Sequence, residues 1–157
     1  MRASYDVEPQ WYIYQPGRAF LLYDWRFTVD GTDFWIPAMI YDIDGASIPW
    51  LFRKIPFIGR PFDKANLIGA GAHDPLFLTH VLGFSGANEV ARQLWIQGGK
   101  SKLAASTMHA AVSSPFGRIS YHNTQADIEE LNLIRRQIKQ RQDWQKFETL
   151  WFSMPKK

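Results

Sequence analysis

The first forty residues carry an alternation of hydrophobic and polar side chains that is typical of half-buried β-strands. Residues 19–29 end in this alternation, and residues 34–37 return as a partner strand after an Asp-Gly pair at 30–31. That pair favours a tight hairpin because glycine accepts positive φ without steric cost. Residues 11–14 form another strand, closed by a Pro-Gly pair at 16–17. We therefore predict an antiparallel β meander in the N-terminal third.

The pattern changes to short helices after these strands. Ser47 is a good N-cap with a proline in the following turn, so a short helix is predicted to begin there. A second helical segment is predicted to run from residues 63–68 toward His73. Pro75 then favours a new helix start near Asp74, which would leave His73 at the mouth of that helix.

Two further helices are predicted in the middle of the chain. Ser85 is a candidate N-cap with Glu89 in the first turn, and a Gly-Gly pair at 98–99 ends that helix. Its apolar residues fall on one face: Val90, Leu94 and Trp95. Residues 101–112 form the next helix, which ends before Pro115 because proline disfavours helical geometry in the residue before it.

The last part of the sequence has the pattern of an amphipathic helix. Residues 124–127 resemble a capping box. Apolar residues then recur at helical spacing and end in an aromatic cluster: Ile128, Leu131, Ile134, Ile138, Trp144, Phe147 and Trp151. The predicted fold class is therefore α+β, with an N-terminal antiparallel meander, several short helices and a long C-terminal amphipathic helix. Residues 1–122 would form one domain, and residues 123–157 a helical extension that packs on this domain or on a partner.

Composition narrows the class of protein. The 157 residues are 46% hydrophobic and 15% aromatic, which is enough apolar material for one aromatic-rich core. Cysteine is absent, so disulfides and thiolate zinc sites are excluded and any metal needs His and carboxylate ligands. We see neither a signal-peptide block nor a bilayer-spanning stretch, and expect neither independent secretion nor a membrane partner. The net charge is +3, but the Lys and Arg residues are scattered among Asp and Glu along the sequence. This distribution disfavours nucleic-acid binding, which needs basic residues concentrated on one face.

The densest group of reactive side chains lies at a predicted strand-to-helix junction, residues 41–49. Alternation puts Asp42 and Asp44 on the same side of the strand end, while Ser47 stands at a helix N-terminus. A carboxylate in this position can hold a metal, orient a histidine or satisfy free backbone amides. Capping of a turn by Asp44 and Ser47 is the simpler alternative.

A second group of such side chains follows further along the chain. On one continuous helix, His73 and His80 would share a face about 10 Å apart, too far to ligate one metal together. The side chains of His73 and Asp74 are expected to diverge, because adjacent residues on a helix do not face each other. Together with Asp44 they make a candidate metal site of two carboxylates and one imidazole for zinc or another divalent ion, in which Ser47 orients a water.

Other interpretations of these residues stay open. Ser47 can act as a nucleophile with His73 as its base and an aspartate as the orienter, although the sequence has no GxSxG elbow here. A structural role, in which a buried carboxylate satisfies the imidazole of His73, is an equally good account. His109 is expected to pack within a helix, and His122 to lie in a loop. The candidate catalytic residues are Asp44, Ser47, His73 and Asp74.

Two spaced motifs add a resemblance to this picture. Residues 44–49 are D-G-A-S-I-P, and residues 73–77 are H-D-P-L-F. In this order they resemble the patterns D-x-A-S-[IV]-P and H-D-x-L-[YF] of a family of small phage and prophage proteins, catalogued as a domain of unknown function, number 1353. The resemblance covers about residues 33–117, so the C-terminal extension lies beyond it. Phe77 stands where the family usually has tyrosine.

The resemblance implies a phage context without an established reaction. We expect a phage-encoded virion-associated or assembly protein, in the tail or baseplate, located in the host cytoplasm during assembly and then in the virion. Its partners would be other phage structural proteins, with self-association through the C-terminal helix. If the chain is an enzyme, the alternative is a metal-dependent hydrolase of bacterial cell-wall material. A small effector that binds a host protein is a third hypothesis.

Overall fold

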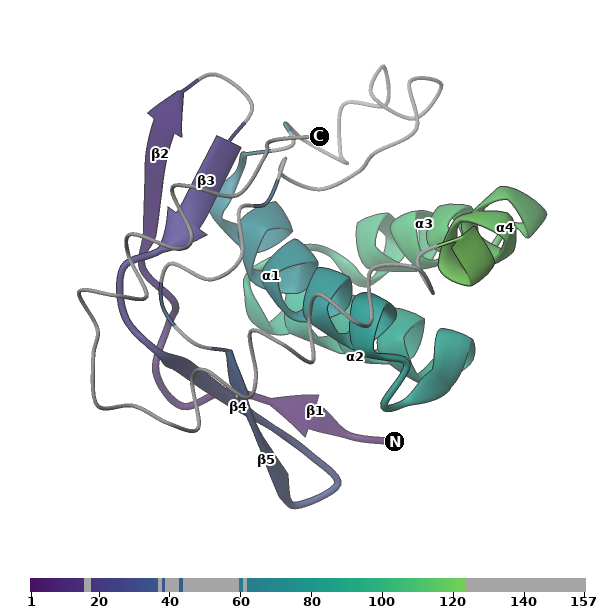
Figure 1. Ribbon diagram of the computed structural model, residues 1–157, viewed down its shortest axis with the longest axis horizontal. Helices are drawn as coiled ribbons and strands as arrows, with labels where there is room; N and C mark the ends of the chain where they lie inside the picture. The colour runs from purple at the N-terminus through teal and green to yellow at the C-terminus, as the bar shows by residue number, and fades with distance from the viewer. Residues whose placement is uncertain (16–17, 37, 39–42, 44–59, 61, 124–157) are drawn as a thin grey trace.

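The computed structural model describes residues 1–15, 18–36, 38, 43, 60 and 62–123. Within these residues the strands come first and the helices second, so the α+β class is confirmed. The strands lie on one side of the molecule and the helices on the other (Figure 1). The helix predicted at Ser47 and the predicted C-terminal helix beyond residue 123 lie outside the described residues, and the domain boundary at residue 122 stays a prediction.

Five strands of the described chain form two antiparallel sheets. β1 (Ala3–Ser4), β4 (Trp25–Val29) and β5 (Thr32–Ile36) make a sheet in the order β1-β4-β5. β2 (Trp11–Gln15) and β3 (Arg18–Leu21) pair separately as a hairpin. The antiparallel pairing agrees with the prediction. The strands do not form one meander, however, because the first strand pairs with the fourth.

The strand predicted over residues 19–29 is interrupted by a corner. β3 ends at Leu21 and β4 begins at Trp25, with bends between them. The side chain of Asp24 in this corner accepts a hydrogen bond from the backbone N–H of Ala38 (2.9 Å). This hydrogen bond holds the corner at which the chain leaves the β2–β3 hairpin and enters the β1-β4-β5 sheet.

The Asp-Gly hairpin between β4 and β5 is confirmed. Asp30 has φ of 48° and Gly31 has φ of 80°, so both central residues take left-handed geometry. Such a turn matches the right-handed twist of the strands that it joins. The register therefore pairs Val29 directly with Thr32.

Four helices follow in the described part of the chain: α1 (Lys64–Thr79), α2 (Gly83–Gln97), α3 (Lys102–Val112) and α4 (Pro115–Asn123). Each packs on the next one, with the closest association between α1 and α2. α2 also contacts the N-terminal strand β1. The helix pair α1–α2 is thus the element to which both the strands and the later helices attach (Figure 1).

The helix starts agree with the sequence prediction in one case and differ in another. α3 begins where the helix over residues 101–112 is predicted, and Ser101 caps it, because its Oγ accepts the backbone N–H of Ala104 (3.2 Å). α2 begins at Gly83 instead of at Ser85. His80 and Gly83 have φ of 54° and 67°, and the N–H of Gly83 donates to the carbonyl of His80 (3.1 Å). This tight turn restarts the helix before the predicted cap.

Pro75 lies inside α1, so the predicted helix start near Asp74 is wrong. A proline within a helix costs about 3 kcal/mol through a lost hydrogen bond and a steric clash. The helix nevertheless continues, because Ala72 and Leu76 on either side of the proline are buried in the core (0% and 3% exposed). Breaking the helix would expose this apolar surface. His73 is therefore in the helix interior, not at a helix mouth.

His122 lies in α4, which contradicts the expectation of a loop. Its neighbour Tyr121 is buried and packs against Phe77 and Phe84, at 4.9 and 5.5 Å between ring centroids. His80 stacks on Tyr121 at 3.8 Å, and its Nε2 lies 3.1 Å from the backbone carbonyl of Tyr121, to which it donates. Through these contacts α4 packs on the turn between α1 and α2, and this packing stabilises the helix around His122.

Two groups of buried side chains form the core between strands and helices. The larger one includes Leu21, Trp25, Phe27, Val29, Ile36, Ile68, Leu76, Val90 and Leu94. The smaller one consists of Ala19, Ile43, Leu67, Ala70, Ala91, Trp95, Ala105 and Met108. The apolar face predicted for the helix around residues 90–95 is therefore confirmed, since all three of its residues are at most 2% exposed.

Two glycines allow tryptophans to approach the backbone of α1. A Cβ atom on Gly69 would overlap the indole ring of Trp95 from α2. A Cβ atom on Gly71 would overlap the ring of Trp11 from β2. The missing side chains therefore set how closely α1 packs between the hairpin and α2.

Gly71→Ala should destabilise the fold, although glycine is normally the weaker helix former by about 0.5–1 kcal/mol. We expect the free energy of unfolding to fall by roughly 1–3 kcal/mol, because the added methyl group must displace the ring of Trp11. Denaturant unfolding measures this change. In a Trp11→Leu background the ring is gone, and the same substitution should cost much less. An equal cost in both backgrounds would contradict this account.

Candidate functional site

His73 is held at both ring nitrogens by neighbouring side chains. Its Nδ1 lies 3.1 Å from Oδ1 of Asp74, and its Nε2 lies 2.9 Å from Oδ1 of Asn88. The ring also packs on Phe77, with 4.7 Å between centroids. Only 13% of the side chain of His73 and 29% of that of Asp74 are exposed. The imidazole is thus built into the junction between α1 and α2.

The contact between His73 and Asp74 corrects the prediction that these side chains diverge. Sequence spacing alone separates adjacent residues on a helix. Nδ1 is the ring nitrogen nearer to the backbone, however, and a short carboxylate on the next residue can turn to reach it. Here it does so at 3.1 Å, so local hydrogen bonding overrides the spacing.

Asn88 connects His73 to the end of α3. Its side chain is fully buried on α2. Its Nδ2 donates to Oγ of Ser113 (3.2 Å) and, at the longer distance of 3.5 Å, to the backbone carbonyl of Val112. A buried amide needs such partners, because an unpaired buried polar group costs about 1–3 kcal/mol. One amide therefore joins residues of three helices.

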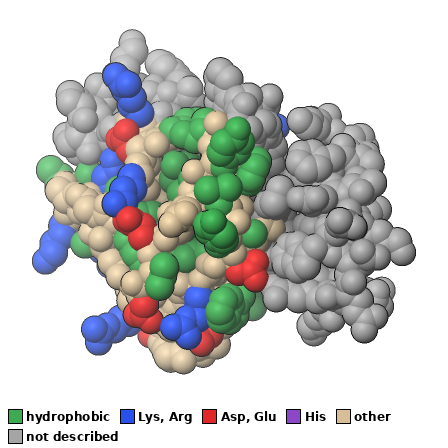
Figure 2. Space-filling model, turned by 90° about the vertical axis from the view of Figure 1, so that its left-hand side faces the viewer, with side chains coloured by type: hydrophobic (Ala, Val, Ile, Leu, Met, Phe, Trp, Pro, Cys, Tyr) green, Lys and Arg blue, Asp and Glu red, His purple; other side chains and the backbone are tan. Residues whose placement is uncertain are grey.

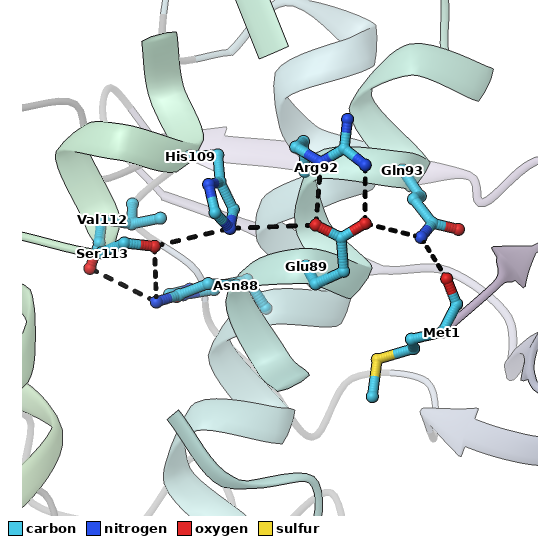
Figure 3. Close-up of polar contacts among 9 residues, drawn as sticks. Met1, Asn88, Glu89, Arg92, Gln93, His109, Val112 and Ser113 are labelled. Atoms are coloured by element: carbon cyan, nitrogen blue, oxygen red, sulfur yellow. Dashed lines mark hydrogen bonds and ion pairs between the residues drawn. The ribbon is translucent and has the colours of Figure 1, made fainter. Parts of the chain in front are cut away.

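The polar contacts continue from Ser113 to His109 and Glu89, as Figure 3 shows. Oγ of Ser113 lies 3.5 Å from Nε2 of His109, and the same Nε2 lies 3.9 Å from Oε2 of Glu89. In a catalytic serine relay, the serine and the acid face opposite nitrogens of the ring. Here both face the same nitrogen, so this trio is a packing contact. That agrees with the role expected of His109.

Glu89 carries a negative charge that its neighbours on α2 stabilise. Arg92 donates to both of its carboxylate oxygens (2.8 and 2.6 Å), and Nε2 of Gln93 donates to one of them (2.7 Å). The hydrogen bond from Arg92 is the main reason that the pKa of Glu89 is lowered to about 2. Burial lowers the pKa of His109 below its ordinary value, which favours the neutral ring. Glu89 is therefore an ionised anchor for Arg92 and Gln93.

The structure describes two of the four predicted site residues. His73 and Asp74 meet, as above, whereas Asp44 and Ser47 lie outside the described residues. Next to this motif the backbone of Ile43 pairs with that of Ala19 in β3, with two N–H to O distances of 2.9 Å. The approach of Asp44 to His73 therefore stays a prediction.

Sequence reasoning missed Asn88 and Ser113. A signal for Asn88 exists in the pattern, because it lies on the apolar side of its helix between Ala87 and Val90, which are both fully buried. A polar side chain on such a face must find a buried partner. Nothing local identifies that partner, since His73 precedes Asn88 by fifteen residues and lies on another helix.

A metal at the predicted set would have to compete with these contacts. Within the part of the chain that the structure describes, no three His, Asp or Glu side chains are grouped so that they could hold a metal ion. Zinc or another divalent ion at Asp44, His73 and Asp74 would need a ring nitrogen of His73, and both nitrogens face partners. A metal bound to Nε2 would therefore displace Asn88, and a metal bound to Nδ1 would compete with the hydrogen bond between His73 and Asp74.

Asn88→Leu should lower the free energy of unfolding by about 2–3 kcal/mol, because it removes the amide that Nε2 of His73 faces and that donates to Oγ of Ser113. Thermal or denaturant unfolding measures this. Replacing both members of the pair by apolar groups, as in His73→Phe with Asn88→Leu, should cost less than the sum of the single changes. Strict additivity would show that the two side chains are not coupled.

Acid should weaken the fold through Glu89. Its pKa is 4.5 in the reference state and about 2 in the folded protein, so its stabilisation is complete above pH 4.5 and is lost as the pH falls toward 2. Glu89→Gln should remove roughly 1–3 kcal/mol of this pH-dependent stability, allowing for partial exposure. Unfolding curves between pH 2 and 6 measure the slope. Arg92→Leu should raise the pKa of Glu89 in an NMR titration, and an unchanged pKa would refute the assigned cause.

No protein-family model, curated protein or solved structure matches this chain. Among the helices of the described residues, none has both the length and the apolar character needed to cross a membrane.

Proposed function

We propose that this chain is a phage-encoded virion-associated or assembly protein of the tail or baseplate. The resemblance of residues 44–49 and 73–77 to a phage and prophage family supports the phage context. The observation that carries the assembly role is a set of large aromatic side chains exposed on the strands and on the corner between β3 and β4.

These exposed aromatic residues are Tyr12, Tyr23 and Trp35, at 51%, 67% and 62% exposure. Figure 2 shows hydrophobic side chains gathered on the side of the molecule where the strands lie. Exposed apolar patches of this kind are typical of surfaces that bind other proteins. Tyrosine and tryptophan are also the residue types that contribute most to binding energy at such surfaces.

Charged residues border this aromatic surface. The guanidinium of Arg26 lies over the ring of Trp35, 5.9 Å from its centroid. Arg26 also pairs with Asp6 (3.2 Å) and Asp33 (3.4 Å). An aromatic centre with a polar, charged rim is the usual composition of a protein–protein interface.

The geometry of His73 supports a structural role for its motif within this proposal. Both ring nitrogens are engaged, by Asp74 and by the buried Asn88. A histidine that links two helices in this way needs no substrate to explain it. The His-Asp motif would then preserve the packing of α1 on α2.

A metal-dependent hydrolase of cell-wall material is the second candidate. The contact that favours it is the one between Asp74 and His73, because a carboxylate commonly orients a histidine that acts as a ligand or a base. Asp44 would complete the metal set, and the ion would supply an activated water beside Ser47. The engagement of Nε2 by Asn88 counts against this candidate.

The proposed function predicts that the protein copurifies with phage particles from a host that carries its gene. Mass spectrometry of gradient-purified particles should find the chain at a fixed ratio to the tail proteins. The double variant Tyr23→Glu/Trp35→Glu should be lost from the particles, because charges would then occupy the aromatic contact surface. Its unfolding temperature should stay within a few degrees of the original, since both side chains are exposed.

Leu103→Glu provides a matched control. Leu103 lies on α3 and is 67% exposed, so it has similar apolar exposure away from the strands. This variant should remain in the particles. Absence of the unmodified chain from particles would refute the proposed function, and equal loss of both variants would refute the role of the strand surface.

A further inference from the structure

The strand β1 is held along both of its edges. On one edge it pairs with β4, with Ala3 opposite Val29 and Ser4 opposite Thr28. On the other edge there is no strand in the described chain; the side-chain amide of Gln93 on α2 takes that place. A short strand at the edge of a sheet is thereby closed off by a helix.

The amide groups of α2 bond to the strand as a neighbouring peptide chain would. Oε1 of Gln93 accepts the backbone N–H of Ala3 (2.6 Å), and its Nε2 donates to the carbonyl of Met1 (2.6 Å). Oε1 of Gln97 accepts the N–H of Tyr5 (3.0 Å), and its Nε2 donates to the carbonyl of the same residue (2.7 Å). The two glutamines are one helical turn apart, which matches the two-residue repeat of the strand.

The position of Gln93 is itself fixed. Its Nε2 also donates to Oε1 of Glu89, which Arg92 holds on both oxygens. Figure 3 shows this chain of contacts from Arg92 through Glu89 and Gln93 to the carbonyl of Met1. The amide is therefore already oriented for an extended backbone.

The side chains of β1 are small, and their polar contact is the one between Oγ of Ser4 and Oγ1 of Thr28 on β4 (3.1 Å). Ala3 is the buried one (7% exposed), and its methyl group belongs to the larger core group. Met1 is 54% exposed. The space between β4 and α2, which we call the strand slot, thus selects an extended backbone with a small residue at the centre. This is the chemistry of peptide recognition by strand addition.

The link between β1 and β2 allows the strand to leave. Val7 is held by a hydrogen bond from the indole N–H of Trp25 to its carbonyl (3.0 Å), and Glu8 by an ion pair with Lys64 (2.7 Å). Asp6 lies before these anchors, and its side chain makes an ion pair with Arg26 (3.2 Å) in which 78% of the Asp6 side chain is exposed. Solvent-exposed ion pairs of this kind contribute at most about 1 kcal/mol, so this contact holds Asp6 only weakly. Rotation of the backbone near Asp6 is therefore enough to release β1 while the rest of the link stays attached.

We propose that the strand slot is an exchange site, in which β1 of one copy docks into the slot of a second copy. The exchanged strand would make the same contacts as the closed one, so the two forms differ mainly in the entropy of the tether. A short tether corresponds to an effective concentration in the millimolar range. Isolated chains would stay closed, and copies held side by side would exchange. The proposed function supplies such neighbours, but the exchange itself needs no particle.

The absence of cysteine makes a direct test possible. One chain carries Ser4→Cys, and a second chain of different mass carries Thr28→Cys. These positions face each other between β1 and β4, with hydroxyl oxygens 3.1 Å apart. The mixture is treated with a short bis-maleimide over a range of concentrations. We expect a crosslinked heterodimer whose yield rises several-fold between micromolar and millimolar chain.

Three controls accompany this test. A single chain with both substitutions should crosslink within itself, which confirms that β1 lies on β4. Ser4→Cys mixed with Ser106→Cys, an exposed position on α3, gives the yield from random collisions. Gln93→Leu with Gln97→Leu should speed the exchange about tenfold or more, because four hydrogen bonds no longer hold the strand closed.

Heterodimer above the collision control, with faster exchange in the glutamine variant, supports the exchange site. Heterodimer at the control level at every concentration, while the double variant crosslinks within one chain, overturns it. A double variant that does not crosslink internally also overturns it, because β1 would then not occupy the slot. These outcomes do not depend on whether the protein is found in particles, so a failure here is distinct from a failure of the proposed function.

Discussion

Burial of the Asn88 amide is the constraint on which the arrangement of the helices depends. The side chain has no access to solvent, so its donors and its acceptor must all be satisfied within the protein. His73 on α1 and Ser113 at the end of α3 supply the partners. A shift of either helix would leave a polar atom unpaired at a cost of about 1–3 kcal/mol. The three helices therefore have one relative position in which this amide is satisfied.

Much of the fold could be predicted because the signals were local. The Asp-Gly turn, the helix that ends before Pro115 and the apolar face around Leu94 follow from turn geometry, the restriction that proline imposes and periodicity, which neighbouring residues determine. Pro75 and Ser85 misled the prediction for the opposite reason. Core burial carries the helix through the proline, and a left-handed turn starts the next helix early.

The candidate site was only partly predictable for a similar reason. The motif at residues 73–77 drew attention to His73 and Asp74, which do meet. The partner that completes the environment of His73 is Asn88, on a different helix, and no local pattern joins the two. The strand β1 is a stronger case, since its two residues carry no strand signal and depend on β4, where the partner of Ser4 lies 24 positions away, and on Gln93, 90 positions from Ala3.

That separation along the chain has a consequence for the order of folding. Hairpins and helices such as β4–β5 and α1–α2 close over short loops, which form in microseconds, whereas contacts between residues far apart in sequence form later. The bonds from Gln93 and Gln97 to the first five residues span about ninety positions. Each newly made chain should therefore pass through a stage in which the acceptor is assembled and its own strand has not yet arrived. During that interval the strand of a chain emerging nearby can dock where its local concentration approaches the effective concentration of the tethered strand, so the rate of synthesis helps to determine which strand docks.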